Sequence, residues 1–134
     1  MLSLESAKHL AAAGIMWDPR PGDRFVIDNE QLHQDVFWIS DLTVEVHHYQ
    51  DQTVLGFNGT TEWALDSVDL DQSIWLPRED QLRELIGDRL NALLRTPDGW
   101  EVRVSGAHGI DVHTAPDVEE AYAAALLAIA DPGS

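Results

Sequence analysis

The stretch Ile74-Trp75-Leu76-Pro77-Arg78-Glu79-Asp80-Gln81-Leu82 joins an apolar segment to the strongest helical pattern in the chain. Pro77 suits the first turn of a helix, because its missing N–H costs no hydrogen bond there. Glu79 and Asp80 place negative charge at the positive end of the helix dipole. Large apolar residues follow at spacings of three and four, at Leu82, Leu85, Ile86, Leu90, Leu93 and Leu94. The pattern predicts a long helix that ends at Pro97-Asp98-Gly99.

The residues before this stretch predict one further helix and several strands. Leu4–Ala13 is alanine-rich, follows the N-cap residue Ser3 and stops at Gly14, which indicates a helix. β-branched, aromatic or alternating segments predict strands at 24–28, 36–39, 43–49 and 53–57. We expect the second of these strands to be covered on both faces. Two prolines and a glycine make Trp17–Asp23 an ordered loop, and 67–73 is acidic and loop-like.

The dipeptide Asn58-Gly59 is the strongest short hairpin signal in the chain. It predicts a returning strand that carries Thr61, Trp63 and Leu65 on one face. A short helix over Thr61–Val68 is left open, because short apolar segments fit both periods.

The C-terminal part predicts a hairpin followed by a helix. Trp100–Val104 alternates between apolar and charged residues, and Gly106-Ala107-His108-Gly109 suits the turn. Ile110 and Val112 continue the partner strand. Pro116 opens the last helix, and acids suited to its dipole follow at Asp117, Glu119 and Glu120. Its apolar stripe consists of Val118, Ala121, Tyr122, Ala125, Leu126 and Ile129.

These elements predict one α+β domain over residues 1–134. Strands outnumber helices and are joined mostly by short turns, so we expect a mostly antiparallel sheet built as a meander with hairpins. About three helices would pack against it in a single pair of layers.

Charge is the most unusual feature of the composition. The chain has 24 acidic and 8 basic residues, a formal net charge of −16, and Lys8 is its one lysine. A field of that sign repels phosphates, so we expect no binding to nucleic acid or to membranes. The acids are scattered, which indicates a solvated surface. An acidic surface that meets a basic partner or imitates DNA is the sharper alternative.

Several classes of protein are excluded by what the chain lacks. The absence of cysteine excludes disulfides, thiolate metal sites and cysteine nucleophiles. No apolar run reaches 18 residues, and the first residues have no basic segment typical of a signal peptide. We therefore expect a cytoplasmic protein.

The segment His47-His48-x-x-Asp51 resembles a metal or hydrolase site only in composition. Adjacent residues of a strand point to opposite faces, so Glu45 and His47 share one side and His48 takes the other. We predict an exposed Glu45–His47 pair and a packed His48.

A second group lies at the C-terminal hairpin. His108 and His113 flank its turn, and Asp111 shares a strand face with His113, but the ligand spacings of known metal motifs are absent. Nucleophile-elbow, P-loop and dinucleotide-binding glycine patterns are absent too. We predict no catalytic residue, no metal ion and no cofactor.

The tryptophans provide the remaining candidate site. Arginine stacked on tryptophan beside Asp23 or Asp80 could form a pocket for a small molecule or a peptide. The candidate ligand-binding residues are Trp17, Arg20, Trp63, Trp75 and Arg78. Ordinary packing, in which the tryptophans complete the core and the arginines cover them, explains the same residues and is favoured.

Four motifs carry a resemblance to a known family, and the resemblance covers nearly the whole chain. They are Trp17-x-Pro19-x-x-Gly22-Asp23, Val36-Phe37-x-x-Ser40-Asp41, residues 57–67 and residues 75–83. The chain resembles a family of small bacterial proteins without an assigned activity, found chiefly in actinobacteria and firmicutes. Its members are often labelled as a pilus assembly protein of the CpaE kind. Pilus proteins of that kind are larger and resemble P-loop ATPases, whose lysine motif this chain lacks, so the resemblance implies a cytoplasmic bacterial protein and supplies no site residue.

Three functions are consistent with these observations. The first is a non-enzymatic interaction or regulatory domain with a protein partner, for which a homodimer is left open. The second is a small-ligand binder or weak hydrolase built on Trp75, Arg78, Asp80 and the loop Trp17–Asp23. The third is an acidic DNA mimic. We favour the first, because no complete catalytic set is present.

Overall fold

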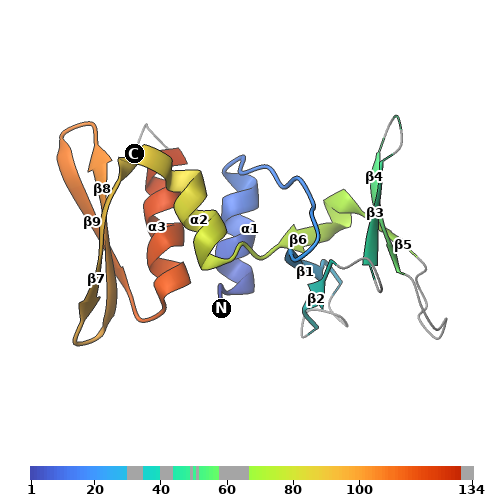
Figure 1. The fold of residues 1–134 in the computed structure, drawn as a ribbon, viewed down its shortest axis with the longest axis horizontal. Helices are drawn as coiled ribbons and strands as arrows, with labels where there is room; N and C mark the ends of the chain where they lie inside the picture. Colours follow the sequence, from blue (N-terminus) through green and yellow to red (C-terminus); the bar gives the residue numbers. More distant parts are fainter. Residues whose placement is uncertain (30–34, 40–43, 49, 51, 58–66, 131–134) are drawn as a thin grey trace. The chain divides into compact units, whose positions relative to one another are not determined.

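A computed structural model describes residues 1–29, 35–39, 44–48, 50, 52–57 and 67–130 (Figure 1). The chain forms two compact units. The terminal unit consists of Met1–Met16 and Pro77–Ser134, and the central unit consists of Trp17–Leu76. Whether the two units form the single expected domain stays a prediction.

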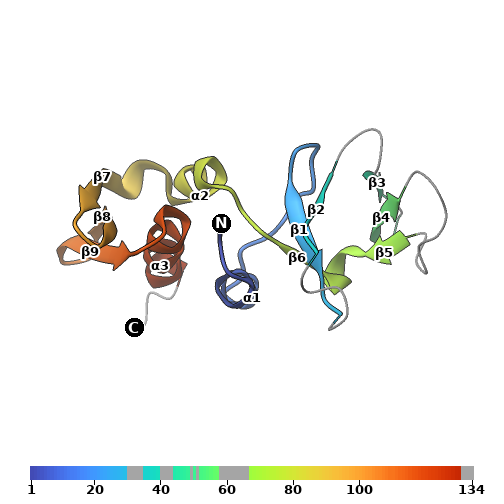
Figure 2. The same cartoon turned by 90° about the horizontal axis from the view of Figure 1, so that it is seen from below.

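The terminal unit contains three helices and one sheet. The helices are α1 (Leu4–Ala12), α2 (Glu79–Ile86) and α3 (Val118–Ala130), and a short 3₁₀ helix, η2 (Gly87–Arg89), follows α2. The strands are β7 (Leu90–Thr96), β8 (Gly99–Gly106) and β9 (Gly109–Ala115), paired antiparallel in the order β7-β8-β9. α3 packs against β8, β9, α1 and α2 (Figure 2), so its apolar stripe forms the centre of this unit.

The long helix predicted from Pro77 is wrong in its second half. α2 ends at Ile86, Gly87 adopts a left-handed φ of 66°, and Leu90–Thr96 forms β7 instead of further helical turns. A β-bulge between Leu90 and Ala92 explains the error. The inserted residue brings Leu90 and Leu93 onto the same strand face, so their spacing of three imitates a helical period.

Both ends of the predicted helix also differ from the expectation. Pro77 precedes α2, and Arg78 is the N-cap residue, whose backbone N–H donates to Oε1 of Gln81 at 2.9 Å. Pro97-Asp98 forms the turn of a hairpin, in which Thr96 lies opposite Gly99.

The acids at the start of α3 make specific hydrogen bonds. Asp117 accepts from the backbone N–H of Glu119 at 2.8 Å, which caps the helix. Glu119 accepts from the N–H of Leu2 at 2.8 Å, and Glu120 accepts from the N–H of Ser3 at 2.7 Å. These two carboxylates therefore attach the start of the chain to α3, in addition to complementing the helix dipole.

The central unit contains two antiparallel sheets. One has the order β2-β1-β6 and consists of β1 (Arg24–Ile27), β2 (Phe37–Trp38) and β6 (Ser73–Trp75). The other has the order β3-β4-β5 and consists of β3 (Val44–His48), β4 (Thr53–Phe57) and β5 (Ser67–Asp69). The four strands predicted before residue 58 are confirmed, the first three with shorter ends and the fourth with the bounds predicted.

The acidic loop predicted at 67–73 is wrong. Ser67–Asp69 pairs with β4, Leu70–Gln72 is a short 3₁₀ helix (η1), and Ser73 begins β6. Strand pairing uses the backbone, so acidic side chains do not prevent it. The Asn58-Gly59 hairpin and residues 61–66 lie outside the described residues.

An apolar cluster forms the core of the central unit. Its buried residues are Phe25, Ile27 and Ile39. Partly buried residues pack against it, namely Trp17, Phe37, Val46 and Leu70. Trp38 is 50% exposed, so the expectation that this strand is covered on both faces is wrong.

The α+β class is confirmed, and the paired strands are antiparallel. The strands of the described residues form three sheets of three strands rather than one sheet. No helix in the described part of the chain is long and apolar enough to cross a bilayer.

Candidate functional site

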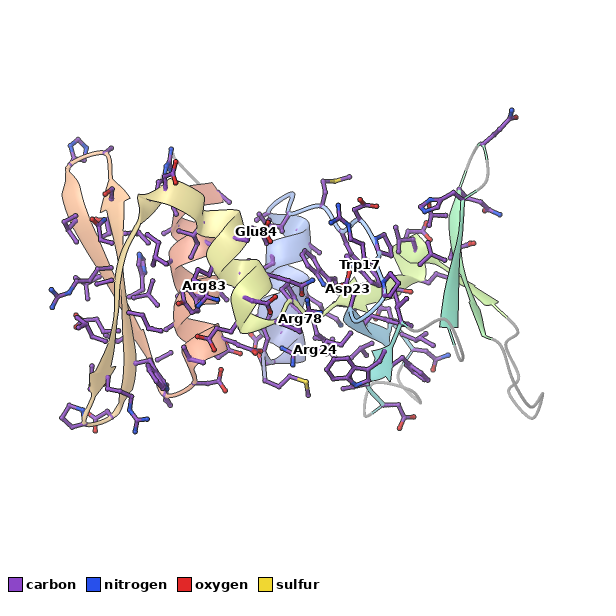
Figure 3. All side chains as sticks on the ribbon, in the orientation of Figure 1. Trp17, Asp23, Arg24, Arg78, Arg83 and Glu84 are labelled. Atoms are coloured by element: carbon purple, nitrogen blue, oxygen red, sulfur yellow. The ribbon has the colours of Figure 1, made fainter. Side chains whose placement is uncertain are left out.

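The structure brings together two of the predicted ligand-binding residues, Trp17 and Trp75. Their rings are stacked, with centroids 6.3 Å apart and an interplanar angle of 5°. Trp17 also donates its indole N–H to Oδ2 of Asp23 at 3.0 Å (Figure 3). The two tryptophans therefore have packing contacts on strand β6 and in the loop before β1, in agreement with the packing interpretation.

Asp23 organises the loop that carries Trp17. Its carboxylate is buried and also accepts from the backbone N–H of Arg20 at 3.1 Å. The backbone of the same loop pairs with Ile39, since Gly22 donates to its carbonyl and Ile39 donates to that of Asp23, each at 2.8 Å. Gly22 has a φ of +93°, which favours glycine at this turn. The loop is thus fixed by hydrogen bonds.

Of the other predicted residues, Arg20 and Arg78 have ion-pair contacts with acidic residues close to them in sequence. The guanidinium of Arg20 lies 3.5 Å from the carboxylate of Asp18, and both side chains are mostly exposed. Arg78 belongs to the terminal unit, where its Nε lies 3.1 Å from Oδ1 of Asp80. The hydrogen bond from Arg78 lowers the pKa of Asp80 below its ordinary value. Trp63 lies outside the described residues. Ligand binding by this set stays a prediction.

Two polar groups of the central unit are buried in a way that could matter for binding. The indole N–H of Trp75 is buried and has no hydrogen-bond partner among the described residues. Arg24 is 8% exposed, donates from Nε to the carbonyl of Leu76 at 3.0 Å and lies 5.9 Å from the ring centre of Trp38. Arg24 therefore has a structural contact, whereas the Trp75 N–H has no hydrogen bond to any described residue.

The predicted histidine groups remain separate. His48 is exposed at the end of β3, with Nδ1 3.4 Å from Oγ1 of Thr53, so the prediction of a packed His48 is wrong. The side chains of Glu45 and His47 lie outside the described part of the structure. His108 is exposed in its turn, and His113 is half-buried. In the residues that are described, no three histidine or acidic side chains are placed to hold a metal ion.

A different surface, on the terminal unit, combines exposed apolar and polar side chains. Along β8, Val102 and Val104 are buried, whereas Arg103 between them is exposed on the opposite face. On that face Arg103 donates from Nε to Glu101 at 2.6 Å. Nearby, Asn91 donates from Nδ2 to the hydroxyl of Ser105 at 2.7 Å. The polar side chains Glu101, Arg103 and Ser105 of β8 therefore form a ridge, in which Arg103 bonds to Glu101 and Ser105 bonds to Asn91 of β7.

Large apolar side chains lie on both sides of this ridge. The strand register places Leu94 of β7 opposite Glu101, Val112 of β9 opposite Arg103, and Ile110 opposite Ser105. Residues opposite one another share a face. Their exposed fractions are 37% for Leu94, 54% for Ile110 and 52% for Val112. We call this surface the outer face; it consists of Leu94, Glu101, Arg103, Ser105, Ile110, Val112 and Thr114.

The sequence interpretation did not identify the outer face, although a signal was present. It assigned Leu94 to a helix and Ile110 and Val112 to a strand without an assigned face. The turn at Gly106–Gly109 fixes the register, so it already places Ile110 opposite Ser105 and Val112 opposite Arg103. The apolar residues of β9 could thus have been assigned to the polar side of the hairpin.

Comparison of the chain with protein-family models, with curated proteins and with solved structures gave no match.

Proposed function

We propose that this chain is a non-enzymatic interaction domain that binds a protein partner through its outer face. The observation that carries the proposal is that Ile110 and Val112, on one face of one strand, are each more than half exposed. Single exposed apolar residues are ordinary on protein surfaces, but adjacent ones beside an arginine are typical of contact surfaces. A cytoplasmic location stays a prediction.

The chemistry of the outer face fits a protein better than a small molecule. Glu101 and Arg103 already bond to each other, so their charges are largely neutralised within the face. A partner can therefore cover them without leaving an unpaired buried charge, which would be costly. The apolar side chains beside them offer contacts to apolar side chains of a partner.

Charge restricts the kind of partner. Within Met1–Met16 and Pro77–Ser134, six basic and twelve acidic residues give a net charge of −6. The long-range field of the unit therefore speeds the approach of a basic partner and slows that of an acidic one, an effect that salt screens.

A small-ligand site in the central unit is the second candidate function. It is supported by the buried Trp75 N–H, which has no hydrogen-bond partner in the part of the chain that the structure describes, beside the stacked ring of Trp17. A buried donor without an acceptor is costly, and a ligand oxygen would satisfy it. Native mass spectrometry of the purified chain tests this candidate, which predicts a bound metabolite that is lost in Trp75→Phe; an unliganded wild type would count against it.

An acidic DNA mimic is the third candidate. It is supported by the composition of Trp17–Leu76, where two basic and twelve acidic residues give a net charge of −10. Competition between the chain and duplex DNA for a basic DNA-binding protein tests it.

Capture from native lysate at physiological salt tests the outer face. The bait variants are Ile110→Glu with Val112→Glu, and as a matched control Leu85→Glu, whose side chain is 41% exposed on α2. We expect wild type and the Leu85 variant to retain the same protein, and the double variant to lose at least about nine-tenths of it, equivalent to about 1.4 kcal/mol. Equal retention by the double variant would overturn the proposal.

A further inference from the structure

Strand β9 has the properties of an edge that pairs with another strand. It is an edge strand of its sheet, and its register with β8 runs without a shift from Gly109 to Ala115. Natural proteins protect such edges with charged residues, above all lysine, with proline or with a bulge; β9 contains no lysine, proline or bulge, and its one acidic residue is Asp111. The opposite edge, β7, contains a bulge at Leu90/Ala92 and stops before Pro97. The two edges of the same sheet therefore differ.

The turn of the hairpin determines which backbone groups of β9 point outward. Gly106 and Gly109 flank a two-residue turn and lie opposite each other, so they form a hydrogen-bonded pair. Bonded and non-bonded pairs alternate along an antiparallel ladder. The N–H and C=O groups of Ile110, Val112 and Thr114 therefore point to the free edge, where no described strand meets them.

We propose that β9 pairs antiparallel with β9 of a second copy of this chain, about a two-fold axis at Val112. In this register Val112 lies opposite the partner's Val112, and Ile110 lies opposite the partner's Thr114. Each outward N–H and C=O of these residues then gains a hydrogen-bond partner. The two sheets become one, and their outer faces become continuous.

The residues along β9 favour the axis at Val112 over axes at Asp111 and at His113. Asp111 lies opposite the partner's His113, which places a carboxylate opposite an imidazole that can donate a hydrogen bond to it. An axis at Asp111 would place the two Asp111 carboxylates opposite each other. An axis at His113 would place Ile110 opposite the partner's Pro116, which has no N–H to donate.

This inference rests on the proposed function, in which the outer face binds a protein. It adds that the edge of β9, beside that face, binds a second copy of the chain. Two variants separate the edge from the face. Val112→Pro removes an outward N–H without removing a bond to β8; because it also changes a side chain of the outer face, Val112→Ala, which keeps the N–H, is its control. Leu94→Glu changes the face on β7, away from the edge.

Sedimentation equilibrium over a concentration series tests the pairing, with circular dichroism to verify folding. We expect wild type and Leu94→Glu to approach twice the chain mass of 14.9 kDa, and Val112→Pro to remain at 14.9 kDa. A wild type that stays at 14.9 kDa overturns the inference. Loss of the dimer in folded Leu94→Glu, or its persistence in Val112→Pro, overturns it as well.

Cysteine cross-linking tests the register and does not depend on Val112→Pro, since the chain has no cysteine of its own. Directly opposite residues have Cα atoms within disulfide range, whereas the two copies of Ile110 would be about 13 Å apart along the strands. We therefore expect a mixture of Ile110→Cys and Thr114→Cys chains to cross-link on oxidation and Ile110→Cys alone to remain uncross-linked. Cross-linking of Ile110→Cys alone, or none in the mixture, overturns the register.

The failures of the two proposals are distinguishable. A monomeric wild type that still captures a protein, and loses it in Leu94→Glu, overturns self-pairing and leaves the interaction domain in place. A dimer that captures no protein through its outer face overturns the proposed function and leaves the pairing of β9 in place.

Discussion

The two units of this chain differ in whether their charged side chains are exposed or buried. In the terminal unit, the salt bridge of Arg103 with Glu101 lies at the surface, and the core is apolar. In the central unit, the charged residues Asp23 and Arg24 are buried close to Trp17 and Trp38 respectively. In the central unit, buried polar groups such as Asp23 therefore hold the loop before β1 in place. In the terminal unit, α3 covers one face of the sheet and leaves the other face exposed.

This difference shows that the overall net charge of −16 is a poor guide to function. The central unit carries −10 of it and the terminal unit −6, from equal numbers of acids and unequal numbers of bases. The surface that we propose for binding lies on the less acidic unit. Substitutions that affect one unit and spare the other test the contrast.

The largest effect is expected from the apolar core of the terminal unit. Leu82 of α2 is fully buried, so Leu82→Ala should lower the free energy of unfolding by about 3 kcal/mol. Chemical denaturation measures the loss, and hydrogen exchange locates it. We expect protection to fall in β8 and α3; a larger fall in β1 and β6 would contradict the separation of the cores.

A somewhat smaller effect is expected from Asp23 in the central unit. Asp23→Ala leaves the indole N–H of Trp17 and the backbone N–H of Arg20 without their acceptor, at a cost of about 2 kcal/mol. Asp23→Asn keeps an acceptor oxygen and should cost about half as much. Tryptophan fluorescence during denaturation measures both, and equal losses in the two variants would show that hydrogen bonding to Asp23 is not the cause.

A third effect is the pH dependence of the stability that Glu120 contributes. Burial and the nearby Asp117 raise the pKa of Glu120, but hydrogen bonds from Ser6 and Ser3 outweigh them and hold this pKa below its ordinary value of 4.5. Since the folded pKa is the lower one, the stabilisation is present above pH 4.5 and is lost as the pH falls through the folded pKa. We expect Glu120→Gln to cost about 1 kcal/mol at pH 7 and less in acid. A difference from wild type that stays constant between pH 7 and pH 3 would contradict this, as measured by urea denaturation.

The smallest effect is expected at Arg78. Its contact with Asp80 is largely exposed, and such pairs contribute about 0.5 kcal/mol or less. Arg78→Ala should therefore leave the thermal midpoint almost unchanged, with Arg83→Ala as a comparison on the same helix. A large loss from Arg78→Ala would indicate a role that its observed contacts do not explain.

Much of the fold could be predicted from the sequence because it follows local signals. Ser3 and Gly14 locate the first helix, and the turn at Gly106–Gly109 locates the last hairpin. Leu90–Thr96 was wrongly predicted because a bulge changes the strand period from two to three, and a single sequence does not mark bulges. Ser67–Asp69 was missed because its strand is defined by pairing with β4, which is a non-local interaction.

The candidate site could be predicted only in part. Trp17 and Trp75 were two of the five candidate ligand-binding residues, but their stacking and the role of Asp23 depend on tertiary contacts, and ligand binding stays a prediction. Burial of Val102 and Val104 under α3 leaves Ile110 and Val112 on the exposed side. The register alone predicts that they share a face with Arg103, whereas their exposure depends on where the helix packs.

Face-dependent capture tests the central claim most directly. Wild type, Leu85→Glu and Ile110→Glu/Val112→Glu are compared as baits at physiological salt. We predict that the first two retain the same protein and that the outer-face variant, still folded, does not. Equal retention by all three baits, or no retained protein with wild type, would contradict a protein-binding role for the outer face of β7, β8 and β9.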